Sequence, residues 1–93
     1  MDALPFSDLP FTPVELVAID PTRNCFRRWR VAASRDLFGR LVIETLWGRI
    51  GARGQSRCVS FADEGAALLH VRPLLARRAG AVRRIGTGYV LRP

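Results

Sequence analysis

The sequence contains no lysine, one histidine (His70) and only two cysteines, Cys25 and Cys58. The cysteines are far apart and neither belongs to a CxxC pair. We therefore expect reduced thiols that act as small apolar fillers, with a disulfide as the alternative. One histidine cannot complete a tetrahedral ligand set with two thiolates, which argues against a metal site. No motif indicates a cofactor or a small-molecule substrate.

Long apolar runs are also absent. No stretch approaches the roughly 18 apolar residues that would span a bilayer, so no membrane segment is expected. The N-terminal stretch MDALPFSDLPF has neither a basic start nor a long apolar run, and so does not have the pattern of a secretion signal. Together with reduced cysteines, these absences predict a cytoplasmic protein, associated with the nucleoid if it binds DNA.

The size and composition fit one small domain. Of the 93 residues, 48% are hydrophobic and 25% charged, which is typical of a globular protein and not of a disordered chain. A chain this short buries only a modest core. A deep active-site cleft between two domains is therefore not expected.

Acidic and basic residues are distributed unevenly. Residues 1–22 contain four acids and no base, whereas residues 23–93 contain all fifteen arginines and four acids, so their charges are −4 and +11. This asymmetry favours a polyanionic partner, nucleic acid in the first place. The alternative is that a GC-rich genome drifts toward arginine and that the charges only keep the protein soluble.

Prolines mark the N-terminal segment. Residues 1–13 contain Pro5, Pro10 and Pro13, and we expect them to form a loosely ordered acidic tail. Their apolar side chains, Leu4, Phe6, Leu9 and Phe11, could pack onto the domain. The domain itself is predicted to comprise residues 14–93.

Alternating, β-branched and aromatic residues predict four strands, over 14–20, 25–33, 40–50 and 57–61. A final edge strand or docked tail is expected over 88–92. Gly39 is expected to take a positive φ in the hairpin turn. In the second strand, alternation places Arg27, Trp29, Val31 and Ala33 on the core face. Arg28 and Arg30 are then expected to point to solvent.

Residues 62–80 change to the apolar period of a helix. Its expected apolar stripe consists of Leu68, Val71, Leu74, Leu75 and Ala79. Asp63 and Glu64 suit the N-terminal end, and Gly80 suits the C-terminal end. Pro73 would remove a helical hydrogen bond, so we expect a kink near 70–73 or two short helices that meet there. The pattern predicts an α+β fold, a small antiparallel sheet of four to five strands with one main, kinked helix on one face.

The stretch ETLWGRIGARGQSR, residues 44–57, places an indole among glycines and guanidinium groups. An indole offers a flat face for a sugar or an unstacked base, and arginines form paired hydrogen bonds with phosphate oxygens. A glycine lets another backbone approach closely, and a glutamine can donate to phosphate or sugar. The residues predicted to bind nucleic acid are Trp47, Gly48, Arg49, Arg53, Gln55 and Arg57.

These residues also have structural alternatives. Alternation puts Trp47 on the same strand face as Ile43, so Trp47 could be a core residue. Arg49 could form a structural ion pair with a carboxylate, that of Glu44, Asp63 or Glu64. Gly51 and Gly54 are expected to serve turn geometry, because no Walker lysine follows them.

The segment from about residue 23 to 92 resembles the WGR domain, which is named for its Trp-Gly-Arg tripeptide. That domain occurs in poly(ADP-ribose) polymerases and as small bacterial proteins. The resemblance rests on the order of an aromatic strand FRRWRV, the stretch WGRIGARGQS, a short strand ending in Phe61, an amphipathic helix and a late GY. The DLFG turn and the polybasic ARRAGAVRR are similar to bacterial stand-alone members.

The resemblance implies a module that, in the polymerases, binds DNA near a break and relays that event to a catalytic domain. It implies that Trp47 stacks on sugar at a strand end and that Arg49 contacts the nucleic-acid backbone and neighbouring domains. This sequence has no room for a catalytic domain or zinc fingers. Only the binding half of the function is therefore expected here.

A second basic cluster, Arg77, Arg78, Arg83 and Arg84, either extends the footprint along a duplex or is a solvated helix face. His70 is expected to be a partly buried helix residue, and Tyr89 could either stack on a ligand or close the core. No nucleophile–base set, paired carboxylates or nucleotide fingerprint is recognisable, so no enzyme is predicted.

The predicted function is that of a non-enzymatic nucleic-acid-binding module, for DNA in the first place, with a preference for strand ends or nicks as a further expectation. Contacts to phosphate and sugar are expected to dominate over base readout. The alternative is a protein-interaction adaptor whose basic face docks an acidic partner protein. The choice between DNA and RNA stays open at this point.

Overall fold

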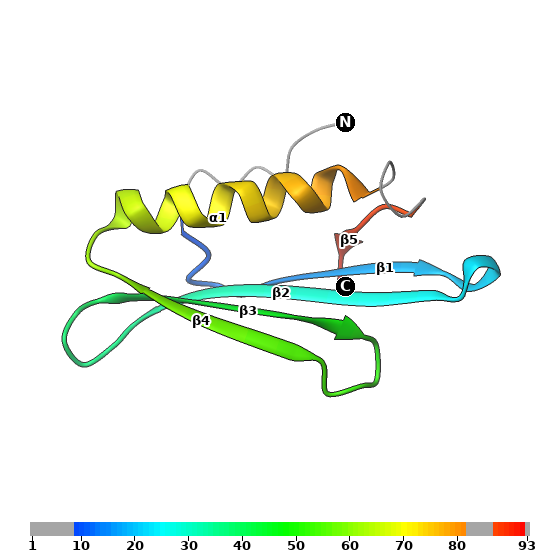
Figure 1. Ribbon diagram of the computed structural model, residues 1–93, viewed down its shortest axis with the longest axis horizontal. Coiled ribbons are helices and arrows are strands. Elements are labelled where there is room, and N and C mark those ends of the chain that lie inside the picture. The colour runs from blue at the N-terminus through cyan, green and yellow to red at the C-terminus, as the bar shows by residue number, and fades with distance from the viewer. Residues whose placement is uncertain (1–8, 82–86, 93) are drawn as a thin grey trace.

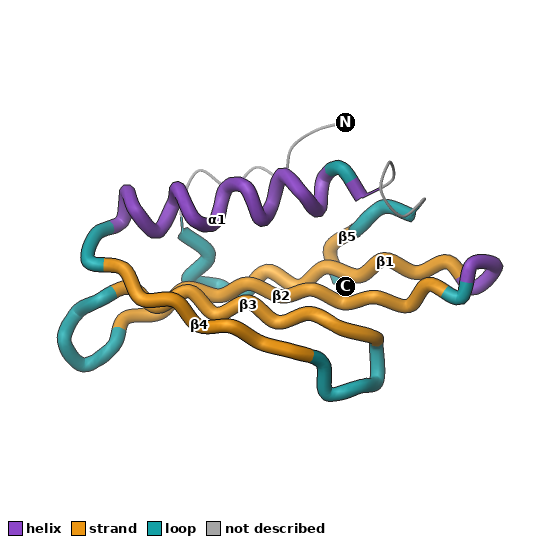
Figure 2. The backbone as a smooth tube through the Cα atoms, in the orientation of Figure 1, coloured by secondary structure: helices purple, strands orange, loops and turns teal. Residues whose placement is uncertain are grey.

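The computed structural model describes residues 9–81 and 87–92, in which one antiparallel sheet is covered on one face by a helix (Figure 1). The sheet order is β4-β3-β2-β1-β5. Its strands are β1 (Val14–Asp20), β2 (Cys25–Arg35), β3 (Leu41–Arg49), β4 (Gln55–Phe61) and β5 (Val90–Leu91). The helix is α1 (Glu64–Ala79), and a short 3-10 helix, η1 (Pro21–Arg23), joins β1 to β2 (Figure 2). The predicted α+β class is confirmed.

The hairpin between β2 and β3 is longer than the alternation predicted. Its ladder continues to the pair Arg35↔Leu41, immediately before the turn. There the Asp36 side chain accepts the backbone N–H of Phe38 at 2.9 Å and that of Arg40 at 3.0 Å. Gly39 has a φ of +79°, as predicted, which a residue with a Cβ rarely adopts.

The core lies between α1 and the central strands. Trp29, at 1% exposed, packs with Val31 from β2 against Val71 and Leu75 of α1. The predicted core role of Trp29 is therefore confirmed. Arg27, expected on the same face, is exposed, because it lies at the end of β2 where a groove opens in place of the core.

Helix α1 is one continuous helix that includes Pro73, so the alternative of two short helices is wrong. Figure 1 shows no sharp bend there, contrary to the expected kink. Pro73 is exposed, and Leu69, whose carbonyl loses the hydrogen bond, is 71% exposed, so water can solvate that carbonyl. The predicted ends are confirmed: Asp63 accepts from the Ala66 N–H at 2.8 Å, and Gly80 caps the C-terminus.

Residues 9–13 contact the domain. Leu9 is buried in the core cluster, whereas Phe11 is half exposed. The Pro10 carbonyl accepts the Ala33 N–H at 2.8 Å, next to the end of the apolar part of β2. Leu4 and Phe6 lie outside the described residues.

Both cysteines are free thiols. Cys25 is half-buried, with its sulfur 3.6 Å from the carbonyl oxygen of Ala18. Cys58 is exposed on β4, so its expected role as an apolar filler is wrong. Among the residues that the structure describes, no helix has the length and hydrophobicity needed to cross a membrane.

Candidate nucleic-acid interface

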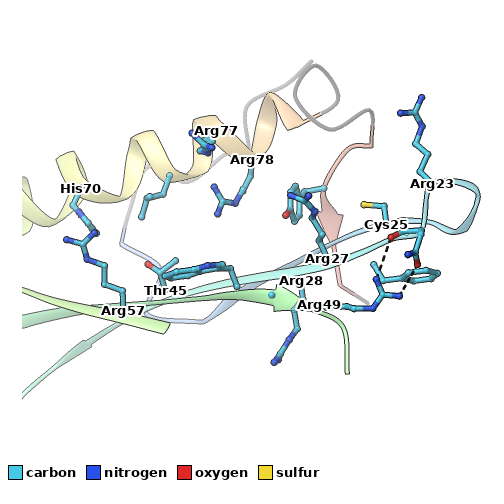
Figure 3. Close-up of a pocket in the computed structure, with 16 residues that line it drawn as sticks. Arg23, Cys25, Arg27, Arg28, Thr45, Arg49, Arg57, His70, Arg77 and Arg78 are labelled. Atoms are coloured by element: carbon cyan, nitrogen blue, oxygen red, sulfur yellow. Dashed lines mark hydrogen bonds between the residues drawn. The ribbon is translucent and has the colours of Figure 1, made fainter. Parts of the chain in front are cut away.

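A groove of about 840 Å³ lies between the C-terminal half of α1 and the ends of β2 and β3 (Figure 3). Guanidinium groups dominate its polar lining, from Arg23, Arg27, Arg49, Arg57, Arg77 and Arg78. Its aromatic lining comes from Phe26, Trp47 and Tyr89. All lining residues lie in the described part of the chain, and none of them is Asp or Glu. The groove therefore favours an anion.

The carboxylates of the described residues bridge arginines mostly elsewhere. Glu15 and Glu44 lie 4.0 and 3.3 Å from Arg30, and Glu64 lies 3.1 Å from Arg35. Asp20 lies 3.6 Å from Arg23, at the rim of the groove. Arg27, Arg49 and Arg57 take part in none of the salt bridges found among residues 9–81 and 87–92. Their charges remain available for a ligand.

Trp47 is half-buried, packs against the core and also lines the groove. It is the cross-strand partner of Trp29, so both indoles lie on the helix-covered face. One part of Trp47 packs against the core cluster, and the rest lines the groove. The indole can thus offer a stacking surface while the core holds it in place.

Arg49 is exposed and is held by neutral groups. Its guanidinium donates to the Asn24 side-chain oxygen at 3.1 Å and to the Asn24 carbonyl at 3.5 Å. Its central carbon lies 4.9 Å from the centre of the Phe26 ring. The alternative of an ion pair with Glu44, Asp63 or Glu64 is wrong. Because the partners are neutral, the positive charge is oriented without being compensated.

The position of Asn24 depends on the cap of η1. Asn24 adopts a left-handed conformation, with φ of +51°, immediately after η1. Asp20 begins this turn by accepting the Thr22 hydroxyl at 2.6 Å and the Thr22 N–H at 3.1 Å. These hydrogen bonds, the one from the Thr22 hydroxyl above all, lower the pKa of Asp20 below its ordinary value of 3.8. A local polar network thus sets the place of Arg49.

Gly48 serves a contact within the protein. A Cβ added at Gly48 would lie 2.7 Å from the Cα of Gly54, and φ at Gly48 is +154°. The backbone that approaches Gly48 is therefore that of the β3–β4 loop. Gly51 and Gly54 have φ of +88° and +74°, which confirms their predicted turn geometry. Arg28 points to the opposite side of the sheet (Figure 3) and donates to the carbonyls of Ala52 and Arg53, which fastens the same loop.

Not all of the residues predicted to bind nucleic acid line the groove. Arg57 rises from β4 toward His70 of α1 at one end of the groove (Figure 3). Arg53 and Gln55 are exposed in the loop and at the start of β4, and they do not line the groove. The half-buried position expected for His70 is confirmed, with its ring 5.1 Å from that of Phe61.

Part of the second basic cluster lines the groove that also contains Trp47 and Arg49. Arg77 and Arg78, in the last turn of α1, line the same groove as Trp47. The Arg78 guanidinium carbon lies 4.7 Å from the Trp29 ring and 5.9 Å from the Tyr89 ring. This guanidinium is therefore held over aromatic surface. Arg83 and Arg84, the other members of the predicted cluster, lie outside the described residues.

Sequence reasoning missed Arg23 and Arg27 as groove residues. Arg27 had a usable signal, since an arginine on the core face of a strand is hard to bury and marks the point where the core ends. Arg23 had none, because its place depends on how η1 turns the chain.

Comparison with known proteins identifies a family. The family model described as WGR domain matches residues 12–81. No curated protein and no solved structure matches the chain.

Proposed function

Because the chain belongs to the WGR domain family, we propose that it is a non-enzymatic module that binds DNA, with a preference for strand ends or nicks. The WGR domain is a nucleic-acid-binding module, not a catalytic domain, in proteins like the poly(ADP-ribose) polymerases. The observation that carries the proposal is the groove itself, where arginines from the sheet and from α1 surround an indole without a lining carboxylate.

The groove chemistry suits a sugar-phosphate backbone. Arginine forms paired hydrogen bonds with phosphate oxygens, and an indole stacks on sugars and bases of any sequence. Phosphate contacts position a protein on nucleic acid but carry no sequence information. We therefore expect binding with little dependence on base sequence.

Arginine variants test the location of the site. Arg57→Ala should weaken DNA binding about tenfold, because a charge-assisted contact to phosphate is lost. Arg30→Ala is the matched control, since it removes the same charge from an arginine that is bridged to Glu15 and Glu44. Fluorescence anisotropy with a labelled duplex at fixed salt measures both. Equal losses in the two variants would show that the net charge, and not the groove, binds DNA.

The end preference has its own test. Competition among linear duplex, nicked circle and sealed circle should rank the sealed circle last. Trp47→Ala should weaken binding to the linear duplex more than to the sealed circle, and Trp47→Phe should keep most of that difference because it retains an aromatic ring. An equal loss on both DNAs would remove the end preference and leave general binding in place.

An adaptor that docks an acidic protein is the second candidate, and an exposed turn favours a protein contact. Leu37 and Phe38, at 100% and 87% exposed, stand side by side at the tip of the β2–β3 hairpin. Absence of binding to any nucleic acid at about 50 mM salt, together with binding of poly-glutamate at the groove, would favour this candidate.

A further inference from the structure

The groove is small and is enclosed from two sides. Its volume of about 840 Å³ lies within the range of roughly 300–1,000 Å³ found for small-ligand pockets. His70, Leu74 and Arg78 of α1 form one wall, and Thr45, Trp47 and Arg57 of the sheet form the other. A duplex is wider than its own major groove, which is about 12 Å across, so a space of this volume cannot hold one. A ligand that reaches the groove interior must be thinner than a duplex.

The interior offers apolar surface as well as charge. Leu74 and Trp47 line opposite walls, and Tyr89 lines the groove beside the guanidinium of Arg78. A site for phosphate alone would need only the cations. Flat apolar surface is what an unpaired base requires, because stacking replaces the neighbours that it loses from the helix.

Guanidinium groups lie along the whole length of the groove, beside this apolar surface. Figure 3 shows Arg57 at one end, Arg78 and Arg27 between, and Arg49 at the other end. A strand that runs along the groove would meet arginines with the phosphates on either side of an inserted base. Guanidinium groups next to stacking surface suit a single strand, in which phosphates alternate with bases.

From its size, its stacking surface and the guanidinium groups beside that surface, we infer that the groove takes an unpaired segment of a single strand, roughly one to three nucleotides long. The inference rests on the proposed function and specifies the form of nucleic acid that occupies the site. Duplex next to the unpaired segment stays outside the groove.

A length series on the unaltered protein tests the inference. Labelled oligothymidylates of one, two, three, six and twelve nucleotides are titrated at about 50 mM salt. Affinity should rise up to about three nucleotides and change less than threefold beyond that length. A blunt-ended duplex should bind at least tenfold more weakly than the same duplex with a three-nucleotide overhang. Equal affinity of these two duplexes would overturn the inference while the proposed DNA binding stands. Absence of binding to all probes would remove both.

A variant whose side chain fills part of the groove gives the second test. Leu74→Trp adds a bulky side chain to the groove wall without changing the charge, and should weaken binding of the trinucleotide at least tenfold while the blunt-ended duplex binds as before. Leu69→Trp is the matched control, because Leu69 lies on the same helix and is 71% exposed. It should change neither affinity. Unaltered trinucleotide binding in a folded Leu74→Trp variant, checked by circular dichroism, would overturn the inference.

Discussion

Close contacts between single residues hold the tryptophan and arginines of the groove in place. Trp47 precedes Gly48, whose Cα lies against Gly54 across the β3–β4 loop, and Arg49 follows it. A Cβ at Gly54 would meet the Trp47 carbonyl oxygen. The two glycines thus let the loop close directly on the strand that carries the indole and the guanidinium.

Gly48→Ala should destabilise the protein by about 3 kcal/mol, because the new Cβ collides with backbone and φ is positive. Gly51→Ala is the control in the same loop. Its φ is also positive, but a Cβ there meets nothing within 4 Å, so we expect a loss of only about 1–2 kcal/mol. Urea denaturation gives both values. A loss at Gly51 as large as that at Gly48 would contradict the importance of the contact with Gly54.

At the level of elements, α1 both closes the core and forms one wall of the groove. Its buried residues are Ala67, Val71 and Leu75, whereas His70, Leu74 and Arg77 face the groove. Three to four residues separate these positions, so each face repeats with the helical period. Any change that bends α1 would move the groove wall relative to Trp47.

Pro73→Ala should stabilise the protein by about 1–3 kcal/mol, because a helix-interior proline is replaced by the best helix former. Pro73 is exposed, so little packing is lost. The neighbouring exposed Arg72→Ala should change the free energy of unfolding by less than about 0.5 kcal/mol. Thermal and urea unfolding followed by circular dichroism check both variants. A loss of stability in Pro73→Ala would show that the helix depends on the proline geometry.

At the scale of the whole molecule, the ion pair near the β2–β3 turn and the arginine-lined groove lie at different ends. The hairpin turn between β2 and β3 lies at one end of the 47 Å long axis, and η1, between β1 and β2, lies at the other (Figure 1). Near the hairpin turn, Arg35 is bridged to Glu64 and Asp36 accepts turn amides. The groove end instead gathers arginines without a lining carboxylate. Among the described residues, arginines without a neighbouring carboxylate in the lining are therefore concentrated at the groove end.

Binding to DNA should weaken steeply as salt increases. If about five phosphates are neutralised, the logarithm of the affinity should fall with the logarithm of salt concentration at a slope of about −4 to −5. Arg57→Ala should reduce the magnitude of the slope by about 1, whereas Arg30→Ala should leave it unchanged. Anisotropy titrations between about 50 and 200 mM salt measure these slopes. A slope close to zero would contradict phosphate contacts as the main source of affinity.

The sequence by itself determined the elements and the class of the fold. Alternation in 25–33 predicted that Trp29 is buried, and the helical period in 62–80 predicted the helix with its caps at Asp63 and Gly80. These features depend on neighbouring residues, so local patterns reveal them. The same patterns failed at Pro73, where no break occurs because the Leu69 carbonyl that loses its helical hydrogen bond lies at an exposed residue and can be solvated.

Only the tertiary structure decided the composition of the groove. Arg27, Trp47 and Arg77 come from β2, β3 and α1 and meet because α1 packs across both strands. The backbone that contacts Gly48 and the neutral side chain that accepts from Arg49 likewise come from segments between strands that fold back onto the sheet. Such contacts join residues distant in the chain, and periodicity along the chain carries no information about which distant residues come together.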